Sequence, residues 1–148
     1  MKRVLICLLV AACLVAVTVI AQAAVKRGTY RGKTGADDPV SFKVTRAKKV
    51  TQFSYDRIHL TCTDGDSYDS TRATPPGQKV NVTRRGRLEF EAGNADRSFR
   101  FQVAGRIRSP RASGTIQVFA TFDENNQLDP NGSVRCDSGE LKWNVRRR

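Results

Sequence analysis

The arginines of this sequence are numerous and clustered enough to form a binding site for anions. The 148 residues include 26 Lys and Arg against 14 Asp and Glu, which gives a formal net charge of +12. Two clusters stand out, one at a predicted turn and one along a face of a predicted strand: Arg84, Arg85 and Arg87, and Arg100, Arg106 and Arg108. Guanidinium groups stay charged and bind phosphate or carboxylate oxygens as a planar fork. The clusters predict binding to an anionic cell-envelope polymer, phospholipid or extracellular nucleic acid by charge, without sequence-specific base readout; a solvated basic surface without a partner is the alternative.

Carboxylates supply a second, enzymatic interpretation. A small extracellular hydrolase could draw its acid and base from Glu89, Glu91, Glu124 and Glu140, although no spacing places two of them together. His59 is the only histidine, and no Gly-x-Ser-x-Gly frame surrounds a serine. We therefore expect no cofactor and no catalytic residue, and prefer a non-enzymatic binding module.

Two acidic loops have spacings that a calcium ion could use. They contain Asp64, Asp66 and Asp69 in one loop and Asp123, Asn125 and Asp129 in the other. Neither completes an EF-hand pattern, so turns capped by the side chains are the preferred interpretation. A disulfide between Cys62 and Cys136 would bring the first loop close to Asp137, which leaves calcium binding there open.

The N-terminus has the layout of a secretory signal peptide. Lys2 and Arg3 precede an apolar run over residues 4–20, and Ala21-Gln22-Ala23 follows as a cleavage site. Residues 1–23 would then be removed, leaving a domain of residues 24–148 with 24 basic and 14 acidic groups and no membrane span. The expected location is extracellular or in the cell envelope. An uncleaved anchor and lipidation at Cys13 are the alternatives.

The cysteines agree with export. Cys7 and Cys13 leave with the signal, so the mature chain retains only Cys62 and Cys136, an even pair in an oxidising compartment. We expect these two to form a disulfide. A redox or metal pair is the alternative, but there is no Cys-x-x-Cys.

Period-two alternation of apolar and polar residues predicts strands through nearly the whole mature chain. Eight to ten short strands in a single domain predict an all-β fold, either an antiparallel barrel or a β-sandwich. Trp143 should be buried, a bulge should fall near Asp56 and Arg57, and a bulge at Gly105 would separate Arg100 from Arg106 and Arg108. Residues 146–148 are expected to fray as a basic tail.

Several motifs resemble an uncharacterised family of small secreted bacterial all-β proteins. They lie at residues 28–34 (GTYRGKT), 39–44 (PVSFKV), 62–66 (CTDGD) and 123–143, where Cys136-x-Ser138-Gly139 leads to Trp143. The resemblance implies an all-β domain and no assigned activity. The first motif also resembles the opening strand of small ligand-holding barrels, which adds a small ligand to the expected partners.

Overall fold

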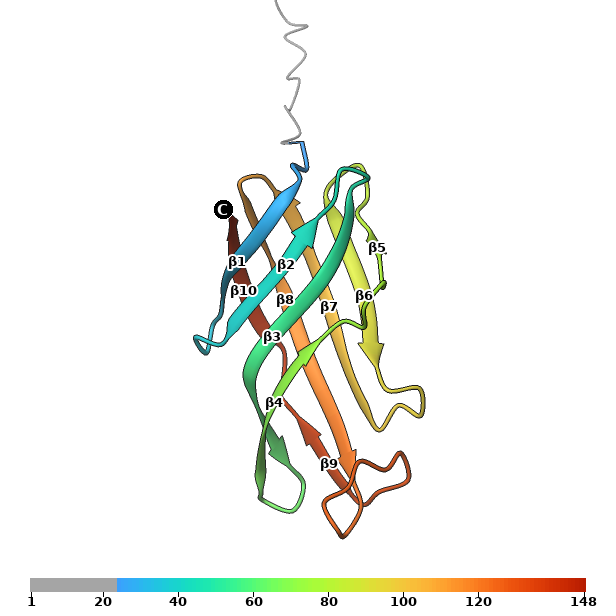
Figure 1. The fold of residues 1–148 in the computed structure, drawn as a ribbon. Helices are drawn as coiled ribbons and strands as arrows, with labels where there is room; N and C mark the ends of the chain where they lie inside the picture. The colour runs from blue at the N-terminus through green and yellow to red at the C-terminus, as the bar shows by residue number, and fades with distance from the viewer. Residues whose placement is uncertain (1–23) are drawn as a thin grey trace, which may run out of the picture.

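A computed structural model describes residues 24–148; the predicted signal peptide, anchor and lipidation site lie outside the described residues. The predicted all-β class is confirmed (Figure 1). The strands are β1 (Gly28–Thr34), β2 (Pro39–Val44), β3 (Lys49–Cys62), β4 (Ser67–Ala73), β5 (Val80–Asn81), β6 (Arg87–Gly93), β7 (Phe99–Arg108), β8 (Arg111–Phe122), β9 (Val134–Asp137) and β10 (Leu141–Arg147).

The strands form a closed six-stranded antiparallel barrel, so of the two predicted architectures the barrel is correct. Pairing runs β10-β1-β2-β3-β9-β8 and returns from β8 to β10. Strands β7 and β6 extend the sheet beyond β8, and β4 and β5 pair with the outer edge of β3. Closure leaves fewer strand edges open to other chains.

Short strand β9 bridges the two longest strands. Its Cys136 pairs directly with Cys62 of β3, and the two form the predicted disulfide, with Cα atoms 4.0 Å apart and a sequence separation of 74. On its other edge, β9 pairs with the end of β8. The disulfide therefore reinforces the barrel at β9, its shortest strand, which has only four residues.

Aromatic side chains fill the interior. Tyr30 stacks on Phe42 at 5.1 Å between ring centroids, and Phe42 stacks on Phe53 at 6.0 Å. Phe101 of β7 reaches across to Phe53 and Tyr55 of β3, with centroids 6.2 and 5.3 Å away. The two Phe101 contacts join β7 to β3, which are not neighbours in the sheet, so aromatic side chains fill the space between these strands.

Trp143 is fully buried, as predicted, and packs over two facing glycines. Gly114 of β8 pairs with both Trp143 and Gly105 of β7. A Cβ at Gly105 or Gly114 would lie 2.5 or 2.6 Å from the indole Cζ2. The indole thus occupies space that only glycine leaves open, and its Nε1 donates to the Thr115 carbonyl at 2.9 Å. Strand β7 keeps a regular register past Gly105, without a bulge.

The backbone tests two further predictions, the bulge in β3 and the frayed tail at residues 146–148. The predicted bulge in β3 is confirmed, because the register with β4 shifts between Tyr55 and Ile58. The prediction that residues 146–148 fray is wrong. Arg146 and Arg147 continue β10 between β8 and β1, and the Arg148 amide donates to the Thr29 carbonyl at 2.9 Å. Backbone pairing on both edges outweighs the repulsion among these charged side chains.

Replacing Trp143 with alanine should lower the free energy of unfolding by about 3 to 5 kcal/mol, because the two glycines cannot fill the cavity. Lys142→Ala, one residue away on the outer face, is the matched control and should change it by less than about 0.5 kcal/mol. Urea unfolding followed by circular dichroism measures both. A loss below about 1 kcal/mol for Trp143→Ala would contradict this packing.

Replacing both Cys62 and Cys136 with alanine should cost about 4 kcal/mol of unfolding free energy, because the bridge constrains a long loop of the unfolded chain. The same urea experiment measures it. Alkylation of native exported protein that starts at Ala24 should find no free thiol. Two reactive thiols would show that the bridge does not form.

Candidate polyanion-binding face

Four arginines stand side by side on four neighbouring strands. Arg108 of β7 pairs with Arg111 of β8, Arg111 with Arg146 of β10, and Arg146 with Arg31 of β1. All four side chains are exposed. Neighbouring strands lie about 4.8 Å apart, so the four backbone positions span roughly 14 Å. We call this set the arginine row.

Strand alternation turns the arginine row outward. Each of its members follows or precedes a buried core residue in the sequence: Tyr30, Ile107, Ala112 and Val145. Successive side chains of a strand point to opposite faces, so burial of these neighbours forces the arginines to the outside.

A hydroxyl network holds the two ends of the arginine row together. Ser109 lies in the turn between Arg108 and Arg111, and its Oγ is 2.7 Å from the Tyr30 hydroxyl. The same Oγ accepts a hydrogen bond from the Lys26 amide at 2.9 Å. The β7–β8 turn is therefore tied to the segment that enters β1, at the end of the barrel where the C-terminus also lies (Figure 1).

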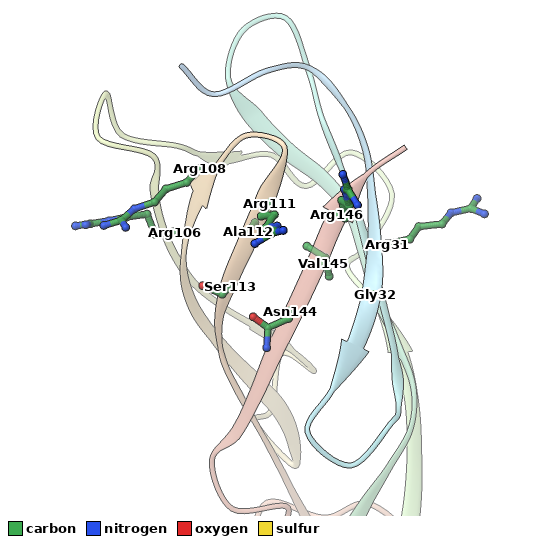
Figure 2. A pocket seen from close by; sticks show the side chains of 10 residues that line it. All are labelled: Arg31, Gly32, Arg106, Arg108, Arg111, Ala112, Ser113, Asn144, Val145 and Arg146. Atoms are coloured by element: carbon green, nitrogen blue, oxygen red, sulfur yellow. The ribbon is translucent and has the colours of Figure 1, made fainter. Parts of the chain in front are cut away.

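A second line of polar residues runs beside the arginine row. Arg106 pairs with Ser113, Ser113 with Asn144, and Asn144 with Lys33. The two lines border an open groove of about 790 Å³. In Figure 2, Arg106 and Arg108 extend to one side and Arg31 to the other, with Arg111 and Arg146 between them. The groove thus offers guanidinium groups in several directions.

The groove is positively charged without local compensation. Its lining contains Arg31, Arg106, Arg108, Arg111 and Arg146 and no acidic residue. Among residues 24–148, no carboxylate oxygen lies within 4.0 Å of a nitrogen of these five guanidinium groups. Like charges on directly paired strand positions repel one another, so an anion bound here would relieve repulsion as well as form contacts.

Of the six arginines predicted to bind a polyanion, five lie in or near this groove, and Arg100 lies apart from it. Arg106 and Arg108 line the groove, and Arg87 pairs with Arg106. Arg84 and Arg85 lie in the adjacent turn, which the Ile107 amide joins by a 2.8 Å hydrogen bond to the Gly86 carbonyl. These residues gather at one end of β7.

Arg100 belongs elsewhere, although it shares the outward face of β7. Its guanidinium lies 4.0 Å from the centroid of the Phe119 ring and 3.3 Å from Glu91. The six residues that separate it from Arg106 correspond to about 20 Å along a strand. Arg100, Arg106 and Arg108 therefore share the outer face of β7, as predicted. Arg100, however, already contacts Glu91 and Phe119.

Three members of the site were not found from the sequence. Arg31, Arg111 and Arg146 occur singly or in an expected tail, and only the register between β1, β10, β8 and β7 places them together. The apolar residues beside them in the sequence indicate that these arginines point outward. The sequence does not indicate the order of their strands.

The carboxylates considered for hydrolysis include Glu91, whose surroundings favour its ionised form. A hydrogen bond from Gln102 at 2.8 Å, followed by the charges of Arg97 and Arg100, keeps the pKa of Glu91 below its ordinary value. A general acid in glycoside hydrolysis needs the opposite shift. Glu89, Glu91 and Glu140 share a smaller outer groove of about 420 Å³, while Glu124 lies in the loop after β8.

The acidic loops direct their oxygens to protein partners. Asp64 accepts from the Asp66 amide at 3.0 Å, and Asp123 and Asp129 cap their own turns in the same way, which confirms the predicted turns. Asp69 instead bonds His59 Nδ1 at 3.0 Å, and Asp137 accepts from Gln117. Within the described residues, no three His, Cys, Asp or Glu side chains gather at metal-binding distance.

In comparisons with known proteins, no family model, curated protein or solved structure matches this chain. Residues 24–148 contain no helix with the length and apolar character needed to cross a lipid bilayer.

Replacing Arg100 with glutamine should leave affinity for heparin within about twofold of the parent, because Glu91 and Phe119 already engage this guanidinium. Loss of the cation–π contact should instead lower stability by about 0.5 to 1 kcal/mol. Heparin titration at low salt, with urea unfolding in parallel, measures both effects. Arg108→Gln is the comparison variant. Equal loss of heparin affinity in the two variants would contradict the assignment of Arg100.

Proposed function

We propose that this protein is an exported, non-enzymatic β module of the cell envelope or extracellular space, and that it binds an anionic polymer along the arginine row. The observation that carries the proposal is the alignment of Arg108, Arg111, Arg146 and Arg31 in one line without a neighbouring carboxylate. Membership of the small secreted bacterial all-β family is part of the same proposal.

The chemistry of arginine supports an anionic partner. Each guanidinium presents a fixed fork of donors that matches two oxygens of a phosphate, sulfate or carboxylate group. Several such groups in one line contact successive charges of a polymer, so weak single contacts add up along the chain. An open groove also keeps the arginines in water, which limits the desolvation cost of binding.

The packed interior supports an external site. Tyr30, Phe42, Phe53 and Phe101 occupy the space in which a barrel protein would otherwise hold a small ligand. We therefore place the ligand on the outer surface. The disulfide is in keeping with an oxidising location outside the cytoplasm.

Replacing Arg108, Arg111 and Arg146 together with glutamine should remove most of the salt-sensitive binding. Duplex DNA is a calibrated probe, because four neutralised charges predict a slope of log affinity against log salt of about −3.6, or roughly a 100-fold loss between 50 and 200 mM. The triple variant should reduce this slope to about −1. Fluorescence titration at four salt concentrations measures it.

The matched control replaces three exposed basic residues on other parts of the surface with glutamine: Arg46, Lys79 and Arg135. It has the same net charge as the triple variant, so the comparison isolates the place at which positive charge is lost. The control should keep a slope close to that of the parent. Equal slopes for the two triple variants would show that net charge alone governs binding and would overturn the proposed site.

A further inference from the structure

We infer that the polymer is an acidic polysaccharide, and that it crosses β7, β8, β10, β1, β2 and β3 at right angles to the strands. This inference rests on the proposed function and adds the chemical class of the ligand and its direction. The line of paired residues that forms the arginine row continues beyond Arg31 onto β2 and β3.

After β1, the residues in this line are serines instead of arginines. Arg31 pairs with Ser41 of β2, and Ser41 pairs with Ser54 of β3. Four guanidinium groups are thus followed by two hydroxyl groups in one continuous line. At a strand spacing of about 4.8 Å, the six positions extend over roughly 24 Å of curved surface.

A second groove follows these serines and joins the first. It has a volume of about 710 Å³, and Arg31 and Gly32 line both grooves. Its polar lining includes Ser41, Ser54, Thr71 and Asp56. A chain bound in the first groove could therefore continue across β1 into the second.

The second groove has the hydrogen-bonding capacity that sugar hydroxyls require. The Ser41 and Ser54 hydroxyls lie 2.8 Å apart, so one donates to the other. Each hydroxyl has one donor and two acceptor sites, so this pair keeps one donor and three acceptor sites for a ligand. Asp56 accepts from Thr71 at 2.6 Å and retains further lone pairs. In the first groove, Ser113 and Asn144 lie directly opposite each other and add neutral donors and acceptors beside the arginines.

The second groove carries both signs of charge and hydroxyl groups, which favours a polymer that has hydroxyl groups as well as acidic groups. Asp56 is the only acidic residue in the linings of the two grooves; it pairs with Arg57 Nε at 3.6 Å, and Arg72 also lines the second groove. A polyphosphate consists of charged groups alone and would bring phosphates close to this carboxylate. Each sugar unit of an acidic polysaccharide carries hydroxyl groups beside its acidic group, and these hydroxyls can donate to Asp56.

The shape of the face argues against a membrane as the partner. Arg106 and Arg108 extend to one side in Figure 2 and Arg31 to the other, because the sheet curves between them. A flat bilayer surface cannot contact both ends together, whereas a flexible chain can follow the curve. We therefore commit to a linear glycan with carboxylate or sulfate groups.

The test compares polygalacturonate, inorganic polyphosphate and phosphatidylglycerol vesicles as probes for the parent and four variants, one of which is the Arg108, Arg111 and Arg146 variant. Replacing Ser41 and Ser54 with alanine should weaken polygalacturonate binding roughly 2- to 10-fold, the effect of losing about one hydrogen bond, and leave polyphosphate binding unchanged. Replacing both serines with threonine keeps the hydroxyls and suits a strand, so binding should be retained. Asp56→Asn should strengthen polyphosphate binding. Circular dichroism confirms that each variant folds.

Each outcome separates the two proposals. If the Arg108, Arg111 and Arg146 variant weakens polygalacturonate and polyphosphate alike but the alanine pair weakens neither, the polysaccharide inference is wrong and the proposed function stands. If the arginine variant weakens neither, both are wrong. Tighter binding of the parent to phosphatidylglycerol vesicles than to polygalacturonate, at equal charge concentration, would also overturn the inference.

Discussion

The contact between Trp143 and two facing glycines fixes the alignment on which the proposed site depends. The indole lies over Gly114 and Gly105, whose missing side chains leave room for it. A slip of β10 by one residue would press the indole against strands that offer no such space, and would also turn every outward side chain inward. Three positions further along the same strands lie Arg146, Arg111 and Arg108. The register that buries the tryptophan is therefore the register that aligns the arginines.

The arginine row is an arrangement that folding alone does not favour. Its members repel one another across paired strands, and no acidic residue in the groove offsets that repulsion. Arg100 shows how the same sheet handles an arginine whose charge is compensated, since Glu91 and Phe119 both contact it. The difference between these two environments is the reason to assign binding to one and structure to the other.

Features that depend on neighbours within one strand can be predicted from the sequence, whereas features that depend on strand order and register cannot. Alternation reveals the strands, the outward facing of Arg106 and Arg108, the burial of Trp143 and the bulge in β3, because each depends on neighbours within one strand. Residues 24–148 contain two cysteines, and an even pair suffices to predict their bridge once export is assumed. Arg31, Arg111 and Arg146 could not be grouped, because they lie on three strands whose order no spacing reveals. The prediction for residues 146–148 is wrong for the same reason: their charge is typical of a frayed tail, and only the pairing with β8 and β1 shows that they continue β10.

The most direct test of this account is nuclear magnetic resonance of the arginine Nε–Hε groups during titration with an acidic oligosaccharide. Each assigned guanidinium reports its own contact, so the measurement locates the ligand without altering the protein. The account predicts that the signals of Arg31, Arg108, Arg111 and Arg146 shift together, with saturation at one concentration, while those of Arg97 and Arg100 stay in place. Equal shifts of all exposed arginines, or shifts confined to Arg97 and Arg100, would contradict it.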